Sequence, residues 1–171
     1  MIQPRRIDKT SKNPIPKPKV VKKKPIKYKK KNHPQYGTSK LEEDFAKQFL
    51  DKLGINYEYQ FEARDIGRYY DFFIPNKDGS HGGLLIEIDG SYFHSDPRLY
   101  EEKDLNGMQK KSKRVDELKN KWALLHGYPL MRIWEKDIRE NPKKVMKRLK
   151  ERLYLMDEEI RKKGRNLGKK L

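Results

Sequence analysis

The sequence predicts a single α/β domain with the element order αβββαβα over residues 37–156. Three observations predict it. Apolar residues recur at helical spacing in three separate segments, and the segments between them are rich in the aromatic and β-branched residues that strands favour. Together these segments span about 120 residues, which is enough to enclose one hydrophobic core. The flanking segments 1–36 and 157–171 are polar and basic, so we expect both to lie outside that core.

The first predicted element is a helix over residues 40–53. Ser39 and Glu42 have the spacing of a capping box, in which each side chain bonds to the backbone N–H of the other residue. Apolar residues then recur at helical spacing until Gly54, which ends the pattern.

Three β-type segments follow, at residues 57–62, 69–74 and 84–89. The turn-rich stretch 75–83 joins the last two, so we expect an antiparallel meander.

The second half of the domain alternates helix and strand. A helix over residues 110–126 ends at Gly127, a strand covers 128–134, and Pro142 opens a last helix in its first turn, where proline is tolerated. Helical spacing predicts two inward-facing stripes: Val115, Leu118, Trp122 and Leu125 in the second helix, and Val145, Leu149, Leu153 and Met156 in the last.

Positive charge is concentrated at the N-terminus. The chain has 42 Lys and Arg against 25 Asp and Glu, a formal charge of +17, and residues 1–36 hold 13 of the basic residues, one acidic residue and six prolines. Such a segment cannot bury enough surface to offset its ordering entropy, so we expect a disordered basic arm. A basic arm indicates a polyanionic partner, DNA or else RNA. The alternative is a solubilising or localising extension without a defined site.

The composition excludes several classes of protein. Because the chain has no cysteine, it cannot be a disulfide scaffold, a thiolate zinc protein or a cysteine-nucleophile enzyme. Its apolar runs are far shorter than the roughly 20 residues that span a bilayer, and no secretory signal follows Met1. We therefore expect an intracellular, cytoplasmic protein without a membrane partner.

Three acidic residues carry the chemical signal. In the segment 84–89, Glu87 and Asp89 are two positions apart and should share one face of a strand. Asp71 lies among core-forming aromatics on the preceding strand, where an unpaired charge would be costly. Carboxylates that converge from adjacent strands suit Mg²⁺, or Mn²⁺ in its place. The alternative for Asp71 is a buried acid paired with a core lysine or arginine.

The order of motifs along the chain resembles the PD-(D/E)XK nuclease superfamily, and within it the very-short-patch-repair-like branch that includes homing endonucleases with an EDxHD active site. The resemblance covers roughly residues 38–152. It is carried by Ser39-x-x-Glu42-x-x-Phe45, Tyr70-Asp71-Phe72, Ile86-Glu87-Ile88-Asp89-Gly90, His94, Asp116-x-x-Lys119 and Gly127-Tyr128-x-x-x-Arg132-Ile133-Trp134-Glu135. It implies a restriction-endonuclease-like αβββαβ core with a C-terminal helix. The implied activity is Mg²⁺-dependent hydrolysis of DNA phosphodiester bonds to 5′-phosphate and 3′-hydroxyl ends.

The resemblance also implies a role for each metal-site residue. Asp71 matches the central metal ligand, the backbone carbonyl of Ile88 completes the metal shell, and Glu87 is a further ligand. Asp89 stands where the superfamily usually has a lysine, so it is either catalytic or a hydrogen-bonding residue of the turn at Gly90.

Three further positions match active-site residues of the branch. His94 matches its active-site histidine and Asp116 the acid that orients this histidine. The alternatives are a loop histidine and an exposed acid spaced i,i+3 from Lys119. Glu42 matches a helix-one glutamate near the metal, although its capping-box role is equally adequate.

Contacts to DNA are expected on both sides of this site. Tyr92 and Phe93 precede His94, where aromatic residues of the repair enzymes wedge into the DNA stack; the alternative is that they pack under the loop. Basic residues on the second helix are expected to touch phosphates or else to form a solvated face: Lys110, Lys111, Lys113, Arg114 and Lys119.

One departure from the branch narrows the expected function. Mismatch-repair members carry a structural zinc held by cysteines, which this chain lacks. The expectation is therefore a homing or phage-type nuclease, encoded by a phage and active in the host cell. As a monomer it would nick one strand, and a double-strand break would need a homodimer. The alternative is a non-catalytic nuclease-fold module that binds nucleic acid within a larger nucleoprotein assembly.

Overall fold

The structure is a computed structural model that describes the backbone of residues 38–168 and the side chains of residues 38–162. The basic arm expected at 1–36 lies outside the described residues. In the described part, no helix is long and apolar enough to cross a membrane.

The predicted first helix is confirmed. Helix α1 (Lys40–Phe45) continues through a π-helical turn over Ala46–Leu50 and a 3₁₀ turn over Asp51–Leu53. Gly54, with φ of 60°, ends it in the left-handed conformation. Both capping-box bonds are present, since the Glu42 amide donates to the Ser39 hydroxyl at 3.2 Å and the Ser39 amide donates to the Glu42 carboxylate at 3.1 Å.

Four strands form one mixed sheet in the order β1-β2-β3-β4. Strands β1 (Glu58–Ala63), β2 (Arg68–Pro75) and β3 (Gly83–Asp89) form the predicted antiparallel meander. Strand β4 (Leu130–Trp134) pairs with β3 in parallel. Because parallel neighbours need a long crossover, the helix between β3 and β4 is required by the topology.

That crossover is helix α2 (Gly107–Leu125), which begins three residues earlier than predicted because Asn106 and Gln109 form a capping box. Its predicted inward stripe is wrong for Leu118 and Leu125, which are 40% and 72% exposed. The residues of α2 that are buried against the sheet side are Lys119, Trp122 and Ala123. The buried face of α2 keeps the predicted Trp122 but has Lys119 and Ala123 in place of Leu118 and Leu125, so the helix presents polar as well as apolar groups to the sheet.

Two helices follow β4. A short helix α3 (Glu135–Glu140) was not predicted, and α4 (Pro142–Gly168) extends well past the expected end at 156. Residues 157–163 contain neither proline nor glycine and are rich in the good helix formers Glu, Lys and Arg, so the helix continues without an apolar stripe. The C-terminal tail predicted for 157–171 is therefore helical up to Gly168.

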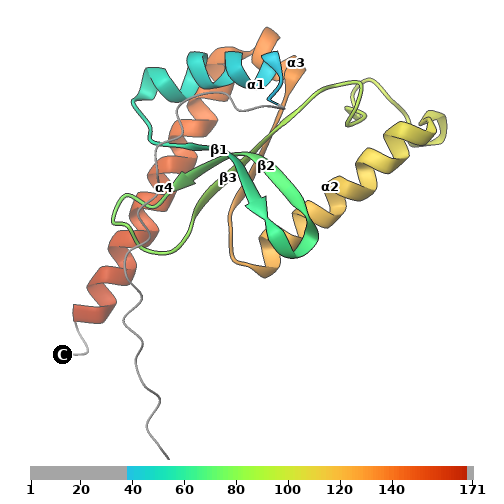
Figure 1. Cartoon of the computed structure of the whole chain (residues 1–171). Helices are drawn as coiled ribbons and strands as arrows, with labels where there is room; N and C mark the ends of the chain where they lie inside the picture. Colours follow the sequence, from blue (N-terminus) through green and yellow to red (C-terminus); the bar gives the residue numbers. More distant parts are fainter. Residues whose placement is uncertain (1–37, 169–171) are drawn as a thin grey trace, which may run out of the picture.

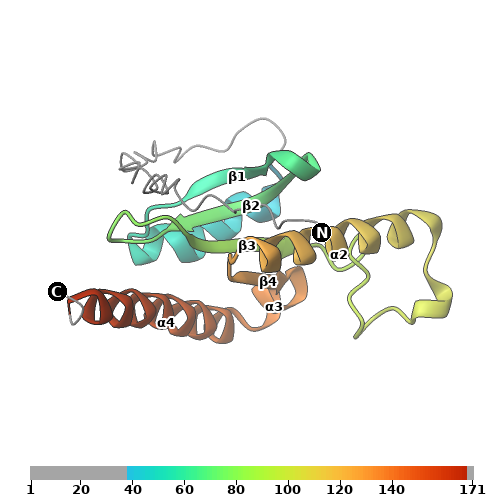
Figure 2. The ribbon, with the colours of Figure 1, turned by 90° about the horizontal axis from the view of Figure 1, so that it is seen from below.

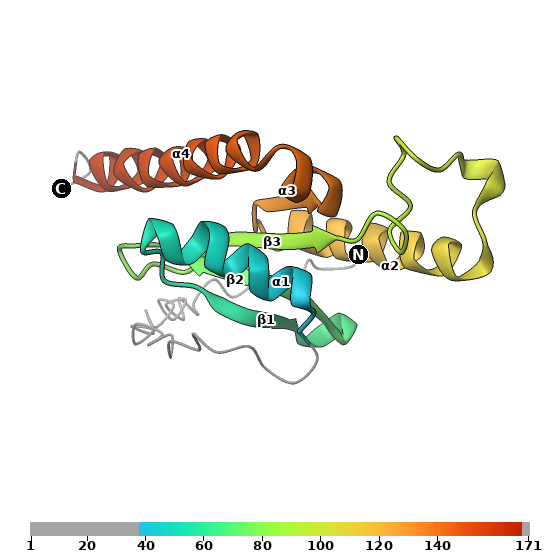
Figure 3. The ribbon, with the colours of Figure 1, turned by 90° about the horizontal axis from the view of Figure 1, so that it is seen from above.

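The elements form three layers, with α1, α3 and α4 on one face of the sheet and α2 on the other (Figures 1 and 2). The larger core lies under α1 and α4 and includes Phe45, Phe72, Ile86 and Leu149. The smaller core lies under α2, around Trp122. Figure 3 shows the connection from β3 to α2 reaching out beyond the end of the sheet. The α/β class and the predicted element order up to β4 are confirmed.

Candidate functional site

Asp71 lies at an interruption in the sheet. The β1–β2 ladder pairs Tyr59 with Phe72 and Phe61 with Tyr70, but it omits Gln60 and Asp71 between them. Gln60 has a φ of 53°, unusual for a residue other than glycine. The Tyr59–Phe72 pair lies in the core under α1, whereas the Phe61–Tyr70 pair lies in the core under α2, so the sheet faces switch at this point.

The interruption frees the Asp71 side chain to contact the next strand. Its Oδ2 accepts a hydrogen bond of 2.6 Å from the backbone N–H of Ile88. The β2–β3 ladder ends at the pair of Phe72 and Ile86, and one further pair in the same register would place Asp71 opposite Glu87. Residues directly opposite in antiparallel strands share a face, so Asp71 and Glu87 come together as predicted.

Strand β3 presents its acids toward α2. Ile86 and Ile88 belong to the core under α1 and α4, so the alternation of the strand places Glu87 and Asp89 on the opposite face. The two acids are 3% and 1% exposed. The prediction that they share a face is confirmed.

Lys119 is the cationic partner of Glu87. It lies on α2, is only 7% exposed, and its ammonium forms an ion pair with Oε1 of Glu87. Tyr70 positions this side chain, because its hydroxyl donates to the Lys119 carbonyl at 2.6 Å and its ring centre lies 5.0 Å from the ammonium. Lys119 was expected to touch DNA phosphates from the helix surface, but its burial and its pairing with Glu87 place it inside the acidic cluster instead.

Burial and neighbouring acids raise the pKa of Asp71. Burial is the largest cause that raises the pKa of Asp71 well above its ordinary value, followed by the charges of Glu87 and then Glu42. Burial also raises the pKa of Glu87 to about 7, although Lys119 opposes the shift. Glu42 is half-buried, so it acts electrostatically on Asp71 while it caps α1. Both expected roles of Glu42 are therefore compatible with its position.

The three acids Asp71, Glu87 and Glu42 together form a site that suits a divalent cation. Three acids supply more negative charge than the single ammonium of Lys119 offsets, and hard oxygen ligands are what Mg²⁺ prefers. Oε1 of Glu87 is buried and, apart from its ion pair, has no hydrogen-bond partner in the described part of the chain. Asp71, Glu87 and the carbonyl of Ile88 are the groups that could hold such an ion.

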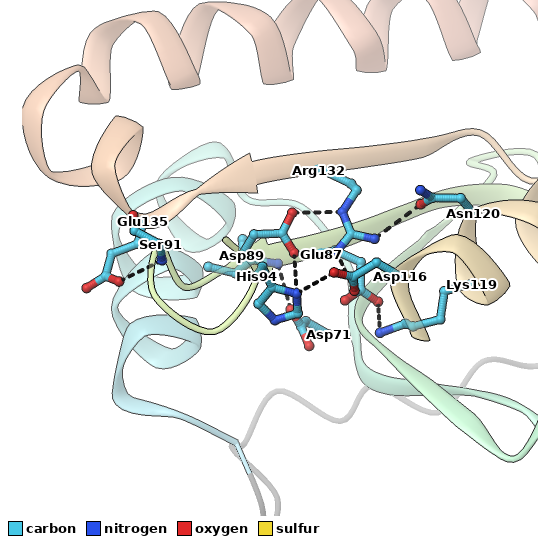
Figure 4. A network of polar contacts seen from close by, with 11 residues as sticks. Asp71, Glu87, Asp89, Ser91, His94, Asp116, Lys119, Asn120, Arg132 and Glu135 are labelled. Atoms are coloured by element: carbon cyan, nitrogen blue, oxygen red, sulfur yellow. Dashed lines mark hydrogen bonds and ion pairs between the residues drawn. The ribbon is translucent and has the colours of Figure 1, made fainter. Parts of the chain in front are cut away.

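His94 stands at the centre of a second polar cluster. Its Nδ1 lies 2.8 Å from Oδ2 of Asp116 on α2 and 3.5 Å from Oδ1 of Asp89 (Figure 4). Burial of the ring opposes its protonation, but the hydrogen bond and charge of Asp116 outweigh burial and raise the pKa of His94. The pairing of His94 with Asp116, expected from the sequence, is therefore present.

Arg132 joins the two acids of this cluster. It reaches from β4, with Nε 2.7 Å and Nη2 2.5 Å from the two oxygens of Asp89, and Nη2 also lies 2.9 Å from Asp116 (Figure 4). Asp89 thus pairs with Arg132 and does not shape the turn at Gly90. Oxygen and nitrogen atoms of Asp89, His94 and Asp116 lie within 4.8 Å of one another and could also hold a metal. The guanidinium already supplies a cation to both acids, so the group around Asp71 fits a metal better.

Arg132 and Lys119 are the site residues whose partners the sequence did not predict. In the parallel register Glu87 pairs with Arg132 and Asp89 with Trp134, so the arginine lies on the same face as both acids. The Arg132-Ile133-Trp134 motif already pointed to this arginine. Its acidic partners could be identified only once β4 was known to lie beside β3.

The remaining predicted DNA contacts lie around this site. Tyr92 and Phe93 are 46% and 56% exposed, so they do not pack under the loop. The four basic residues predicted on the second helix lie in the first turns of α2, where Lys113 forms an ion pair with Glu102 at 2.6 Å and Lys110, Lys111 and Arg114 are exposed.

Glu87 should make stability depend on pH. Its folded-state pKa of about 7 exceeds the ordinary value of 4.5, so the folded chain binds this proton more tightly than the unfolded chain. The free energy of unfolding should therefore fall by up to about 3 kcal/mol as pH rises from about 4.5 to about 7. Urea denaturation in EDTA across this range should show the fall in the wild type and a smaller fall in Glu87→Gln, in which the buried Asp71 still contributes. Glu62→Gln, at an exposed position, is the control, and equal slopes in wild type and Glu87→Gln would contradict the assignment.

Comparisons of this chain with protein-family models, curated proteins and solved structures found no match. The case for a function therefore depends on the two clusters described above.

Proposed function

We propose that this chain is a metal-dependent DNA endonuclease with a restriction-endonuclease-like core of the PD-(D/E)XK type. The observation that carries the proposal is the meeting of two clusters at the C-terminal end of β3. One joins Asp71 and Glu87 with Lys119, and the other pairs His94 with Asp116. Acids suited to a divalent cation beside an oriented histidine are what phosphodiester hydrolysis requires.

The metal would be held by Asp71, Glu87 and the Ile88 carbonyl, with Mg²⁺ or Mn²⁺ as the ion. When bound, such an ion lowers the pKa of a coordinated water and offsets charge on a phosphoryl oxygen. Glu42 adds negative charge near Asp71 and strengthens the preference of this group for a cation.

Lys119 takes the place of the lysine that the strand lacks. In the motif Glu87-x-Asp89, an aspartate occupies the position where the superfamily has lysine. The ammonium of Lys119 reaches the same glutamate from α2. From this position beside Glu87 the ammonium could hold a phosphate oxygen or the attacking water.

His94 is suited to act as the general acid. Its raised pKa favours the protonated ring, and Asp116 fixes Nδ1, so Nε2 is the atom that can meet the substrate. Hydrolysis forms a bond from the water oxygen to phosphorus and breaks the bond from phosphorus to the 3′ oxygen. The attacking water would release one proton to solvent, and the 3′ oxygen would take a proton from Nε2, which solvent then restores. Asp116 and Asp89 would stabilise the imidazolium before this transfer.

Binding to DNA would use the exposed residues Lys110, Lys111 and Arg114 together with the basic segment 1–36. One site per chain would nick one strand, and a double-strand break would need a homodimer. A cytoplasmic, phage-type nuclease is part of the same proposal, and RNA is the alternative ligand of the basic segment.

A second candidate function is a non-catalytic module that binds nucleic acid within a nucleoprotein assembly. Ion pairs already present in the structure favour it, because Lys119 partners Glu87 and Arg132 partners both Asp89 and Asp116. A purely structural cluster of this kind would need no metal.

A plasmid-nicking assay separates the two functions. Supercoiled plasmid incubated with the full chain should relax to the nicked form in Mg²⁺ or Mn²⁺ and stay supercoiled in EDTA. Product ends should carry 5′-phosphate, which ligase will reseal. Binding of DNA without cleavage in either metal, on paired, mismatched and single-stranded substrates, would instead support the non-catalytic module.

A further inference from the structure

The positive charge of the folded domain is concentrated on the first half of α4. Residues 38–141 have 17 Lys and Arg against 20 Asp and Glu, whereas residues 142–156 have six Lys and Arg against the single acid Glu151. The apolar residues Val145 and Leu149 of this half are buried in the core. The basic residues lie on the other faces of the helix, where five are exposed and the last is half-buried: Lys143, Lys144, Lys147, Arg148, Lys150 and Arg152.

Most of these cations have no acidic partner. Among the described side chains, only Lys147 of the six forms an ion pair, with Glu151 at 3.8 Å. Elsewhere in the domain, Arg98, Lys113 and Arg139 each form an ion pair of 2.6 Å. Like charges spaced i,i+4 along a helix repel each other, so the row on α4 costs some stability by itself. A polyanion bound along the row would remove this repulsion.

An open hollow of about 320 Å³ lies where this half of α4 meets β4, the last strand in the order of the sheet. It is lined by Leu130, Met131 and Arg132 of β4 and by Arg148, Glu151, Arg152 and Leu155 of α4. Arginine suits phosphate, because its planar fork can donate two hydrogen bonds to one phosphate group. Glu151 pairs with Lys147, and Arg132 pairs with two acids of the site. Arg148 and Arg152 are therefore the lining groups best placed to bind an anion.

Arg132 connects this hollow to the candidate site. It lines the hollow and also a cavity beside His94, on the α2 side of the sheet. Its guanidinium pairs there with Asp89 and Asp116. The basic face of α4 is therefore next to the His94 cluster around the outer edge of β4.

The length of the basic face fits a short stretch of one nucleic-acid strand. From Lys143 to Arg152 the helix rises about 14 Å, at about 1.5 Å per residue. One strand of duplex DNA has a phosphate for about every 3.4 Å of helix axis, so about four phosphates match this length. Three consecutive acids, Asp157, Glu158 and Glu159, follow and mark the end of the basic face.

We propose that the first half of α4 binds the phosphate backbone of the DNA that flanks the cut position, with Arg148 and Arg152 as its main contacts. The inference rests on the proposed function, because it takes the bound polyanion to be the substrate. It adds a surface on the opposite face of the sheet from α2, and it implies a substrate that extends several nucleotides beyond the candidate site. Contacts to phosphates add affinity without sequence preference.

The salt dependence of DNA binding tests this surface. Binding of the full chain to a long labelled duplex is followed by anisotropy in Ca²⁺, so that it is observed apart from cleavage. In Lys144→Gln/Arg148→Gln/Arg152→Gln, the slope of log K against log salt should be less steep by about 3, from about 0.9 per phosphate contact. Between about 50 and 200 mM salt, the affinity of the wild type should therefore fall about 40-fold more than that of the variant.

The matched control removes three charges from another helix. Lys40→Gln/Lys47→Gln/Lys52→Gln changes α1, where Lys40 and Lys47 already pair with Asp44 and Glu43, so its slope should equal that of the wild type. In nicking assays the α4 variant should have a raised KM and an unchanged kcat, because a backbone contact binds substrate and transition state alike.

Each outcome separates the surface from the reaction. Equal slopes in the wild type and the α4 variant, with plasmid still nicked, would overturn the role of α4 and leave the nuclease intact. A reduced slope without nicking in any metal would support the surface and overturn the nuclease. A slope that is reduced for RNA but not for DNA would overturn DNA as the partner of α4.

Discussion

Replacing Asp71 by asparagine should lower Mg²⁺-dependent nicking by about 10³-fold or more, because it removes a carboxylate that would hold the proposed metal. A bound metal supplies several kcal/mol of transition-state stabilisation, and each 1.4 kcal/mol corresponds to about tenfold in rate. The asparagine oxygen can still accept the hydrogen bond from Ile88. Folding should therefore survive, and the metal-free variant should be at least as stable as the wild type because a buried, repelled charge is gone.

Metal binding provides the second readout for the same variant. Mn²⁺ or Mg²⁺ should raise the melting temperature of the wild type and leave that of Asp71→Asn unchanged, since a ligand stabilises only the state that binds it. Asp65→Asn is the matched control, because Asp65 also accepts an N–H hydrogen bond, from Trp122 at 2.6 Å, but lies outside both clusters. If Asp71→Asn nicks DNA as fast as the wild type, Asp71 is not the metal ligand.

Replacing His94 by asparagine should lower the rate of nicking by about 10²–10⁴-fold, the usual contribution of a positioned acid or base. In the proposed mechanism the protonated ring of His94 is the active form. The rate should therefore fall as pH rises through the pKa of His94, which lies above its ordinary value of 6.5. This decline at high pH should be absent from what activity His94→Asn retains.

Asp116 should set the pH at which the nicking rate declines. Its hydrogen bond and charge raise the pKa of His94, so Asp116→Asn should move the decline to lower pH. His126→Asn is the control, since His126 lies at the far end of α2 and stacks on Trp122. Its pH–rate profile should match the wild type. A decline unmoved in Asp116→Asn would show that another group titrates.

Local pattern was sufficient to predict much of the fold. The capping box of Ser39 and Glu42, the alternation of Ile86 to Asp89 and the glycine that ends α1 are all properties of residues close in sequence. Prediction from the sequence failed where an element's orientation depended on the element that packs against it. Leu118 and Leu125 have helical spacing but face solvent, because the rotation of α2 is set by Trp122, Ala123 and the ion pair of Lys119.

In the candidate site, too, some residues could be predicted from the sequence and others could not. Asp71, Glu87, His94 and Asp116 could be named from their motifs, and the structure brings them together in two adjacent clusters. Their cationic partners could not be named, because an arginine on a later strand becomes the neighbour of an acid only through the parallel register of β3 and β4. A cavity of about 360 Å³ beside His94 is lined by residues as far apart in the chain as Asp89 and Trp134, so no local pattern could predict it.

The sequence by itself therefore determined the order of elements up to β4, the acids that share one face of β3 and the concentration of basic residues in segment 1–36. Each follows from residue type and short-range spacing, which act before any tertiary contact forms. Only the tertiary structure decided which cation meets each acid and which face α2 presents. These depend on how far each helix is rotated and which strands are neighbours, and long-range packing alone fixes both.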